Sequence, residues 1–372
     1  MHLQTISREV PLPVIPQRHE AMVRFILALE RCGFDTANCA KRLGVFPRLG
    51  VNFWQVMRPH WIARPDDAVD NLIKLFVDGH QVSAGALANQ ISSEFVDTAL
   101  EMRLAEKNGD SLEANLSLFP CYGKYIVTDQ AAKNTAINQV MWLWGESYIL
   151  GGLVNRTKSR RRGIDLGTGS GVHAILASDH CASVVGGDVS PRAMAFAKFN
   201  AALNEKSNTD FVLSDLLNSI DGTCDLLIAN VPYAPDTAAK AGDNFWSGGI
   251  DGTDLLRRVV EALPTRLDRD GIAHINSLYP NPPGTKIKDH FDSWLGGKLG
   301  EWEVLEHTWK VPRYQDLLSD QPYSGDKSAW RFGVVSLRRS PSNQGWWKEV
   351  PGRCLFFRAD GSCEVVADHD QN

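Results

Sequence analysis

Apolar residues recur along the chain at two different spacings, and the change between them divides the sequence. In the first third they fall at helical intervals over His19–Cys32, Thr36–Leu43 and 67–78. From Gly163 onward, short apolar runs alternate with helical stretches, an arrangement typical of a parallel sheet flanked by helices. The pattern predicts an α/β domain preceded by a smaller helical domain.

The last segment of the helical part predicts a characteristic order of helices and strands. Helices are predicted over 84–91 and 92–104, and a turn at Lys107–Asp110 leads into alternating apolar residues. Two helices followed by a β-ribbon are the order of a winged-helix module. Such a module either docks on nucleic acid or serves as a packing lid or dimer module. The second role is favoured, because Glu94 and Asp97 make the second helix acidic and poorly suited to phosphates.

The α/β region is expected to contain seven strands with helices between them. The predicted strands are Gly163–Leu166, Ser183–Gly187, Asp210–Leu213, Asp225–Ala229, Ile272–Ser277, Trp302–His307 and Arg331–Leu337. The predicted helices are Val172–Ser178, Pro191–Leu203, Thr253–Leu263 and Thr285–Leu295. The expected parts of the chain are a helical, winged-helix-like domain (1–130), an aromatic connector with a solvated basic linker (131–162), the α/β domain (163–345) and a C-terminal hairpin or tail (346–372).

Composition narrows the class of protein. The chain has 372 residues, 22% of them charged, and a net charge of −5, so the broad basic surface of a nucleic-acid-binding protein is not expected. No apolar run is long enough to span a membrane, and the N-terminus does not read as a signal peptide. The seven cysteines include no Cys-x-x-Cys pair, which indicates a reduced, cytoplasmic protein without a metal site.

A glycine-rich turn is the most informative stretch. Asp165–Gly171 reads Asp-x-Gly-x-Gly-x-Gly directly after a predicted strand, and glycines let a ligand approach the backbone closely. Asp188 ends the next predicted strand, where a carboxylate can accept ribose hydroxyls. An acid before the glycines would repel a pyrophosphate but suits a ligand that carries an ammonium and a sulfonium.

This stretch resembles motif I of the class I S-adenosylmethionine (SAM)-dependent methyltransferases, and the resemblance extends over about 163–340. It implies a Rossmann-like fold with SAM as the cofactor. By this resemblance Asp165 and the glycines would meet the amino-acid arm and backbone of SAM, Asp188 its ribose and Asp215 its adenine. The residues expected to bind SAM are Asp165, Gly167, Thr168, Gly169, Gly171, Asp188, Val189 and Asp215.

A second motif, Asn-Val-Pro-Tyr, follows another apolar strand and should face the same edge of the sheet. The side-chain oxygen of Asn230 and the carbonyl of Val231 can accept two N–H hydrogens and so direct a nitrogen lone pair at the sulfonium carbon. Pro232 fixes the turn, and Tyr233 can stack on a planar substrate or lie against the sulfonium. We expect Asn230, Pro232 and Tyr233 to be the catalytic residues.

The second motif resembles motif IV of the amino-methyltransferases, usually Asn-Pro-Pro-Tyr, although Val231 replaces the first proline. The resemblance implies methyl transfer to a nitrogen, in a small molecule or a protein side chain. An alternative is cyclisation of SAM itself to azetidine-2-carboxylate and methylthioadenosine, because the same fold also hosts such synthases. A third hypothesis is a SAM-responsive regulator that binds nucleic acid, which predicts a basic recognition helix that the sequence lacks. The sequence defines no oligomeric state.

Overall fold

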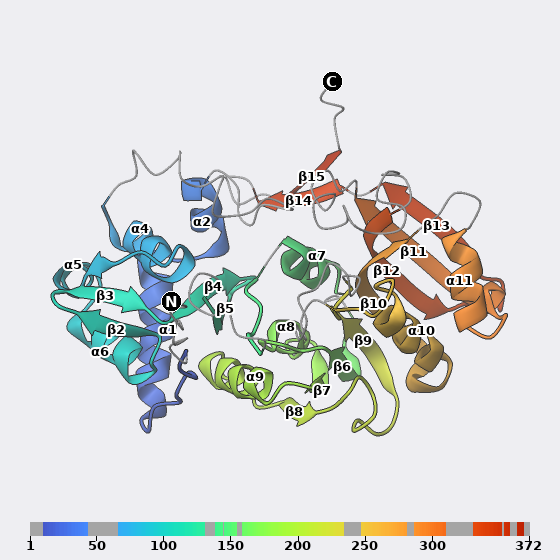
Figure 1. The fold of residues 1–372 in the computed structure, drawn as a ribbon, viewed down its shortest axis with the longest axis horizontal. Coiled ribbons are helices and arrows are strands. Elements are labelled where there is room, and N and C mark those ends of the chain that lie inside the picture. The colour runs from blue at the N-terminus through green and yellow to red at the C-terminus, as the bar shows by residue number, and fades with distance from the viewer. Residues whose placement is uncertain are drawn as a thin grey trace, which may run out of the picture.

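Within the residues that the computed structural model describes, the chain forms one large sheet, three small sheets and the helices around them (Figure 1). The described residues are 10–43, 66–130, 138–143, 145–154, 158–233, 247–280, 286–309, 330–351, 353–357 and 363–367.

The large sheet has the strand order β13-β11-β12-β10-β9-β6-β7-β8. Its strands are β6 (Arg160–Leu166), β7 (Cys181–Asp188), β8 (Thr209–Leu213), β9 (Cys224–Ala229), β10 (Leu267–Pro280), β11 (Trp302–Trp309), β12 (Trp330–Arg339) and β13 (Trp346–Pro351). Strands β6 to β10 run parallel, whereas β12 is antiparallel to both of its neighbours. The predicted Rossmann-like α/β fold is confirmed, and β13 carries the sheet past the boundary expected at residue 345.

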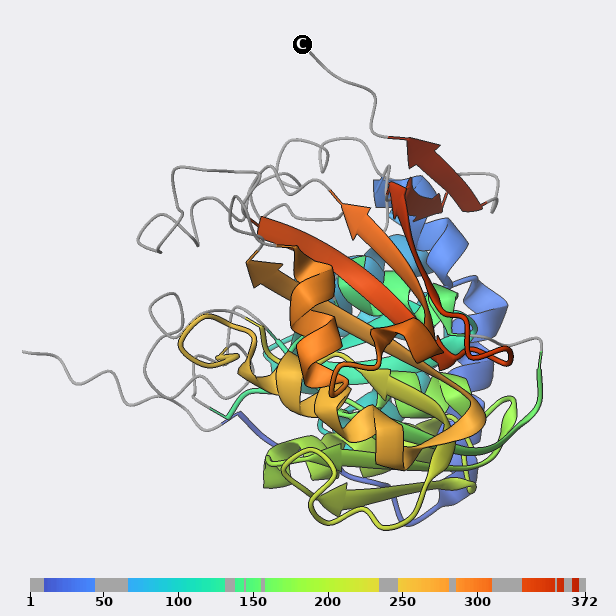
Figure 2. The same cartoon turned by 90° about the vertical axis from the view of Figure 1, so that its right-hand side faces the viewer.

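Helices cover both faces of this sheet. One face carries α7 (Gly145–Leu153), α8 (Val172–Ala177) and α9 (Pro191–Leu203), and the other carries α10 (Asp254–Arg266) and α11 (Ile287–Trp294), which lie in front of the sheet in Figure 2. Leu226 and Leu227, neighbours on β9, belong to two different apolar clusters. Successive side chains of a strand point to opposite faces, so a strand covered on both sides must be apolar throughout.

The N-terminal unit combines helices with a small antiparallel sheet of order β1-β3-β2 (Figure 1). Its elements are α1 (His19–Cys32), α2 (Thr36–Leu43), α4 (Ala68–Leu72), the π-helical turn η2 (Ile73–Val77), β1 (Val82–Ser83), α5 (Ala84–Gln90), α6 (Ser93–Glu101), β2 (Ala105–Asn108) and β3 (Ser111–Ala114). The helices predicted here are all present, and the winged-helix interpretation stays a prediction. In the described ranges no helix has both the length and the apolar character needed to cross a bilayer.

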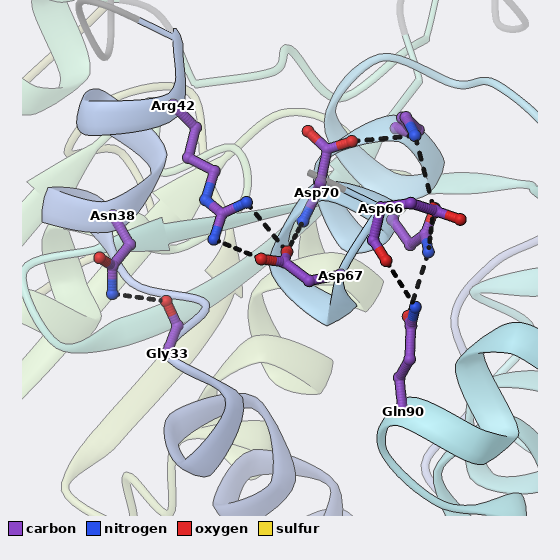
Figure 3. A network of polar contacts seen from close by, with 9 residues as sticks. Gly33, Asn38, Arg42, Asp66, Asp67, Asp70 and Gln90 are labelled. Carbon is purple, nitrogen blue, oxygen red and sulfur yellow. Dashed lines mark hydrogen bonds and ion pairs between the residues drawn. The ribbon is translucent and has the colours of Figure 1, made fainter. Parts of the chain in front are cut away.

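A polar network joins three helices of this unit (Figure 3). Arg42 on α2 donates to both carboxylate oxygens of Asp67, at 2.9 and 2.7 Å, and Asp67 also caps α4 by accepting from the Asp70 amide. Asn71 on α4 donates to Gln90 at the end of α5 at 3.0 Å. A bidentate arginine–carboxylate pair fixes orientation as well as distance, so α2 and α4 are held at a defined angle.

A hairpin connects the N-terminal unit to the large sheet. It consists of β4 (Leu116–Cys121) and β5 (Lys124–Asp129), and two asparagines of α9 bond to its backbone. Asn200 pairs with the N–H and C=O of Val127, both at 2.8 Å, and Asn204 pairs with those of Tyr125 at 2.9 and 2.7 Å. One apolar cluster runs from α1 through this hairpin to α7, α8 and α9. The N-terminal unit therefore shares a core with one face of the large sheet, while the second cluster lies wholly within the α/β domain.

The basic linker predicted up to Arg162 was partly wrong. Arg160–Arg162 open strand β6, and Arg160 is buried. The carboxylate of Asp225 accepts hydrogen bonds from the backbone N–H groups of Arg161 and Arg162, each at 2.8 Å, which fixes the start of the strand.

Two short hairpin strands, β14 (Arg353–Phe357) and β15 (Cys363–Ala367), pair at the C-terminal end as expected. The 3-10 turn η3 (Leu299–Glu301) precedes β11.

Candidate active site

A cavity of about 220 Å³ opens where the parallel strands end. Its floor is made by the turns that follow β6, β7, β8 and β9, because parallel strands place their carboxyl ends at one edge of the sheet. Its other walls come from Asn138–Leu143 and from the first turn of α7. In the sequence Trp142, Trp144 and Tyr148 suggest either a roof over the SAM pocket or core packing; Trp142 lies on the cavity wall, and Trp144 lies outside the described residues. Of the predicted residues, those on the cavity wall are Gly167, Thr168, Gly169, Asp188, Val189, Asp215, Asn230 and Pro232.

The turn after β6 depends on its glycines. Gly167, Gly169 and Gly171 have φ values of +65°, +52° and +81°, a region that residues with a Cβ rarely adopt. A Cβ on Gly171 would lie 3.1 Å from the Cα of Ala197, so Gly171 lets the turn pack against α9. Gly171 thus serves close packing and is absent from the lining, whereas Gly167 and Gly169 lie on the wall.

Asp165 lies beneath the turn. It is fully buried, and its Oδ2 accepts from the Thr168 hydroxyl at 2.6 Å and from the Ala174 N–H at 3.1 Å. Burial raises the pKa of this carboxyl to about 7, and the nearby charge of Asp188 adds to the shift. Asp165 therefore holds the turn from below, and this placement does not favour the direct ligand contact predicted from the sequence.

Asp188, by contrast, is directly at the cavity. Its Oδ2 accepts from the Gly169 N–H and its Oδ1 from the Ser190 N–H, each at 2.9 Å. These two bonds fix the carboxylate and leave each oxygen able to accept another hydrogen bond. The apolar side chain of Val189 is 54% exposed beside it, and Asp215 pairs with Arg258 at 2.7 Å at the outer end.

The Asn-Val-Pro-Tyr turn forms the opposite part of the wall. Asn230 and Pro232 line the cavity, whereas Tyr233 is buried behind it and its hydroxyl donates to Oε1 of Glu146 at 3.4 Å. The Nδ2 of Asn276 on β10 donates to the Oδ1 of Asn230 at 2.7 Å. Because Ile275 pairs with Ala229 in the parallel register, Asn276 stands beside Asn230.

Glu146 and Asn276 are two buried polar residues at the site that sequence reasoning missed. Both are buried, Asn276 completely. Burial raises the pKa of Glu146 to about 7. For Asn276 a signal existed. It lies near the end of a predicted strand, and if that strand neighbours the one before Asn230, both residues are expected at the same edge of the sheet. For Glu146 there was none, because its place depends on how α7 packs across the sheet.

Comparison with known proteins finds relatives of the central part of the chain. Residues 148–234 match the family model described as ribosomal protein L11 methyltransferase (PrmA). A Methanocaldococcus jannaschii protein named as a protein N5-glutamine methyltransferase is 33% identical over 117 residues, 30% of this chain and 59% of that protein. The release factor glutamine methyltransferase of Mycolicibacterium smegmatis is 36% identical over 119 residues, 29% of this chain and 42% of the relative.

The chain therefore spans about half the length of the curated relatives it matches. Among solved structures, the ribosomal protein L11 methylase of Lactobacillus delbrueckii subsp. bulgaricus is 19% identical, with a TM-score of 0.35, over 52% of this chain and 77% of that chain.

Proposed function

We propose that this chain, whose central domain is that of a class I SAM-dependent methyltransferase with SAM as its cofactor, methylates a side-chain amide nitrogen of a protein. The observation that carries the proposal is that Asn230 lies on the wall of the same cavity as the glycine turn and Asp188. The glutamine methyltransferases to which the chain is similar favour a glutamine amide in a release factor or ribosomal protein as the acceptor.

The cavity fits SAM by the chemistry of its groups. Asp188 retains acceptor capacity for ribose hydroxyls, and the exposed Val189 offers an apolar surface for the adenine beside Asp215. The glycine turn presents backbone without side chains at Gly167 and Gly169. Asp165 supports this turn through Thr168. When bound, SAM supplies an electrophilic methyl group on a positively charged sulfur.

Asn230 is proposed to orient the acceptor nitrogen. Its side-chain oxygen can accept one N–H of the acceptor while the Val231 carbonyl accepts the other, so the lone pair is directed outward from the amide plane. Asn276 on β10 donates to that same Asn230 oxygen. This bond fixes the rotation of the Asn230 amide group and so the position of its oxygen. Tyr233 is buried against Glu146 and supports the turn from behind.

The product of the reaction tests the proposal. The purified protein should convert SAM to S-adenosylhomocysteine only when a release factor or ribosomal protein is added, and mass spectrometry should place one methyl group on a glutamine. Methylthioadenosine formed from SAM alone, above the spontaneous rate, would instead select the cyclisation alternative. No turnover with any of these proteins would contradict the proposed acceptor class.

Replacing Asn276 with aspartate should lower kcat about tenfold while SAM affinity stays unchanged. Aspartate has nearly the same shape but only accepts, so Asn230 must turn its NH₂ group toward β10 and its oxygen away. The measurement is kcat per folded protein together with calorimetric SAM affinity. Equal kcat in Asn276→Asp and wild type would show that this bond does not orient Asn230.

We further propose that the N-terminal unit is a winged-helix-like packing module and that the protein works in the cytoplasm. The β1-β3-β2 sheet, in which β1 precedes α5 while β2 and β3 follow α6, supports the first point. The exposed residues of α6 include Glu94, Asp97 and Glu101, which disfavours docking on nucleic acid. A cytoplasmic location agrees with a translation protein as the substrate.

A further inference from the structure

We propose that Glu146 is the anionic partner of the ammonium group on the amino-acid arm of SAM. Asp165, which the sequence predicts for this role, lies beneath the glycine turn and outside the cavity lining. The inference rests on the SAM site proposed above and concerns the end of the cavity away from Asp188.

The carboxylates on the cavity wall lie on different sides of the glycine turn. Among the lining residues that the structure describes, the carboxylates are those of Glu146, Asp188 and Asp215. Asp215 follows β8 and Asp188 ends β7, so both lie on one side of the turn that follows β6. Only Glu146 is left for the other side.

The position of Glu146 is fixed by its contact with the motif after β9. Tyr233 donates to its Oε1 at 3.4 Å, and β9 neighbours β6 on the side opposite β7. A Cβ on Gly167 would lie 3.4 Å from Val231, so the glycine turn and the Asn-Val-Pro-Tyr turn touch. A ligand with its ribose at Asp188 therefore extends across the glycine turn toward Glu146.

The chemistry of SAM decides which of its groups suits this carboxylate. An ammonium has three N–H donors and a full charge, which a carboxylate can meet with charge-assisted hydrogen bonds. A sulfonium has charge but no N–H, and its methyl group must face Asn230. Burial raises the pKa of Glu146 to about 7, and an adjacent cation favours the ionised form and reverses this shift.

The test compares three ligands, two that carry the amino-acid arm and one that lacks the whole arm, its carboxylate as well as its ammonium. SAM has the sulfonium and the ammonium, S-adenosylhomocysteine has only the ammonium, and methylthioadenosine has neither. In calorimetry, Glu146→Gln should bind SAM and S-adenosylhomocysteine about 10- to 100-fold more weakly than wild type, the usual loss for a hydrogen bond to a charged group. Its affinity for methylthioadenosine should be unchanged, which also shows that the variant is folded.

Asp188→Asn is the matched control. All three ligands share the ribose, so this variant should weaken the binding of all of them. A Glu146→Gln protein that loses affinity for SAM alone would assign Glu146 to the sulfonium, and one that binds all three ligands like wild type would remove it from the SAM site; either result overturns the inference while the proposed function stands. A wild-type protein that binds none of the three would contradict the proposed function and the inference together.

Discussion

Asn230→Ala is expected to lower kcat by about 10²- to 10³-fold, the usual cost of losing one group that orients or stabilises the reacting centre. The alanine removes the side-chain oxygen of a residue that lines the cavity, and Asn276 loses the acceptor of its hydrogen bond. SAM affinity should remain within about threefold of wild type, because Asp188 and the glycine turn, the predicted SAM contacts, are untouched. Calorimetry with SAM and methyl-transfer assays on the identified acceptor separate the two effects.

The aspartate variant of the same position is the control. Asn230→Asp keeps an acceptor oxygen at the same place and should retain more activity than Asn230→Ala. A purely structural role would instead reduce SAM binding and the melting temperature in both variants. Retention of full activity in Asn230→Ala would remove this residue from the mechanism.

Asp188→Ala should weaken SAM binding by roughly 10- to 100-fold. The variant removes the proposed acceptor for both ribose hydroxyls, and it also frees the N–H groups of Gly169 and Ser190 that the carboxylate holds. Asp210→Ala is a matched control, because Asp210 is an exposed residue of neighbouring β8 and does not line the cavity. If both variants bind SAM like wild type, the ribose partner is another residue.

Much of this site is predictable because of a single topological rule. Gly167, Asp188 and Asn230 each end or follow a strand predicted to be parallel, and parallel strands end at one edge. No contact had to be known to place them together. The sequence also supplied the caps that begin helices, as when Ser190 accepts from the Ala193 N–H ahead of Pro191.

The features that were not predicted depend on the direction of a side chain and on packing between segments that are distant in the sequence. Asp165 is at the expected strand, but its side chain points toward Ala174 of α8 and not into the cavity. Glu146 reaches the site only because α7 packs over the sheet, and Asn276 only through the register of β10 with β9. The basic run was misread because Asp225, 63 residues after Arg162, satisfies its backbone.

A calorimetric titration of the wild-type protein with SAM shows whether this acidic cavity with its glycine turn is a SAM site. We expect saturable binding of one SAM per chain, weakened by Asp188→Ala and preserved in Asn230→Ala. Absence of any binding at millimolar SAM would contradict it.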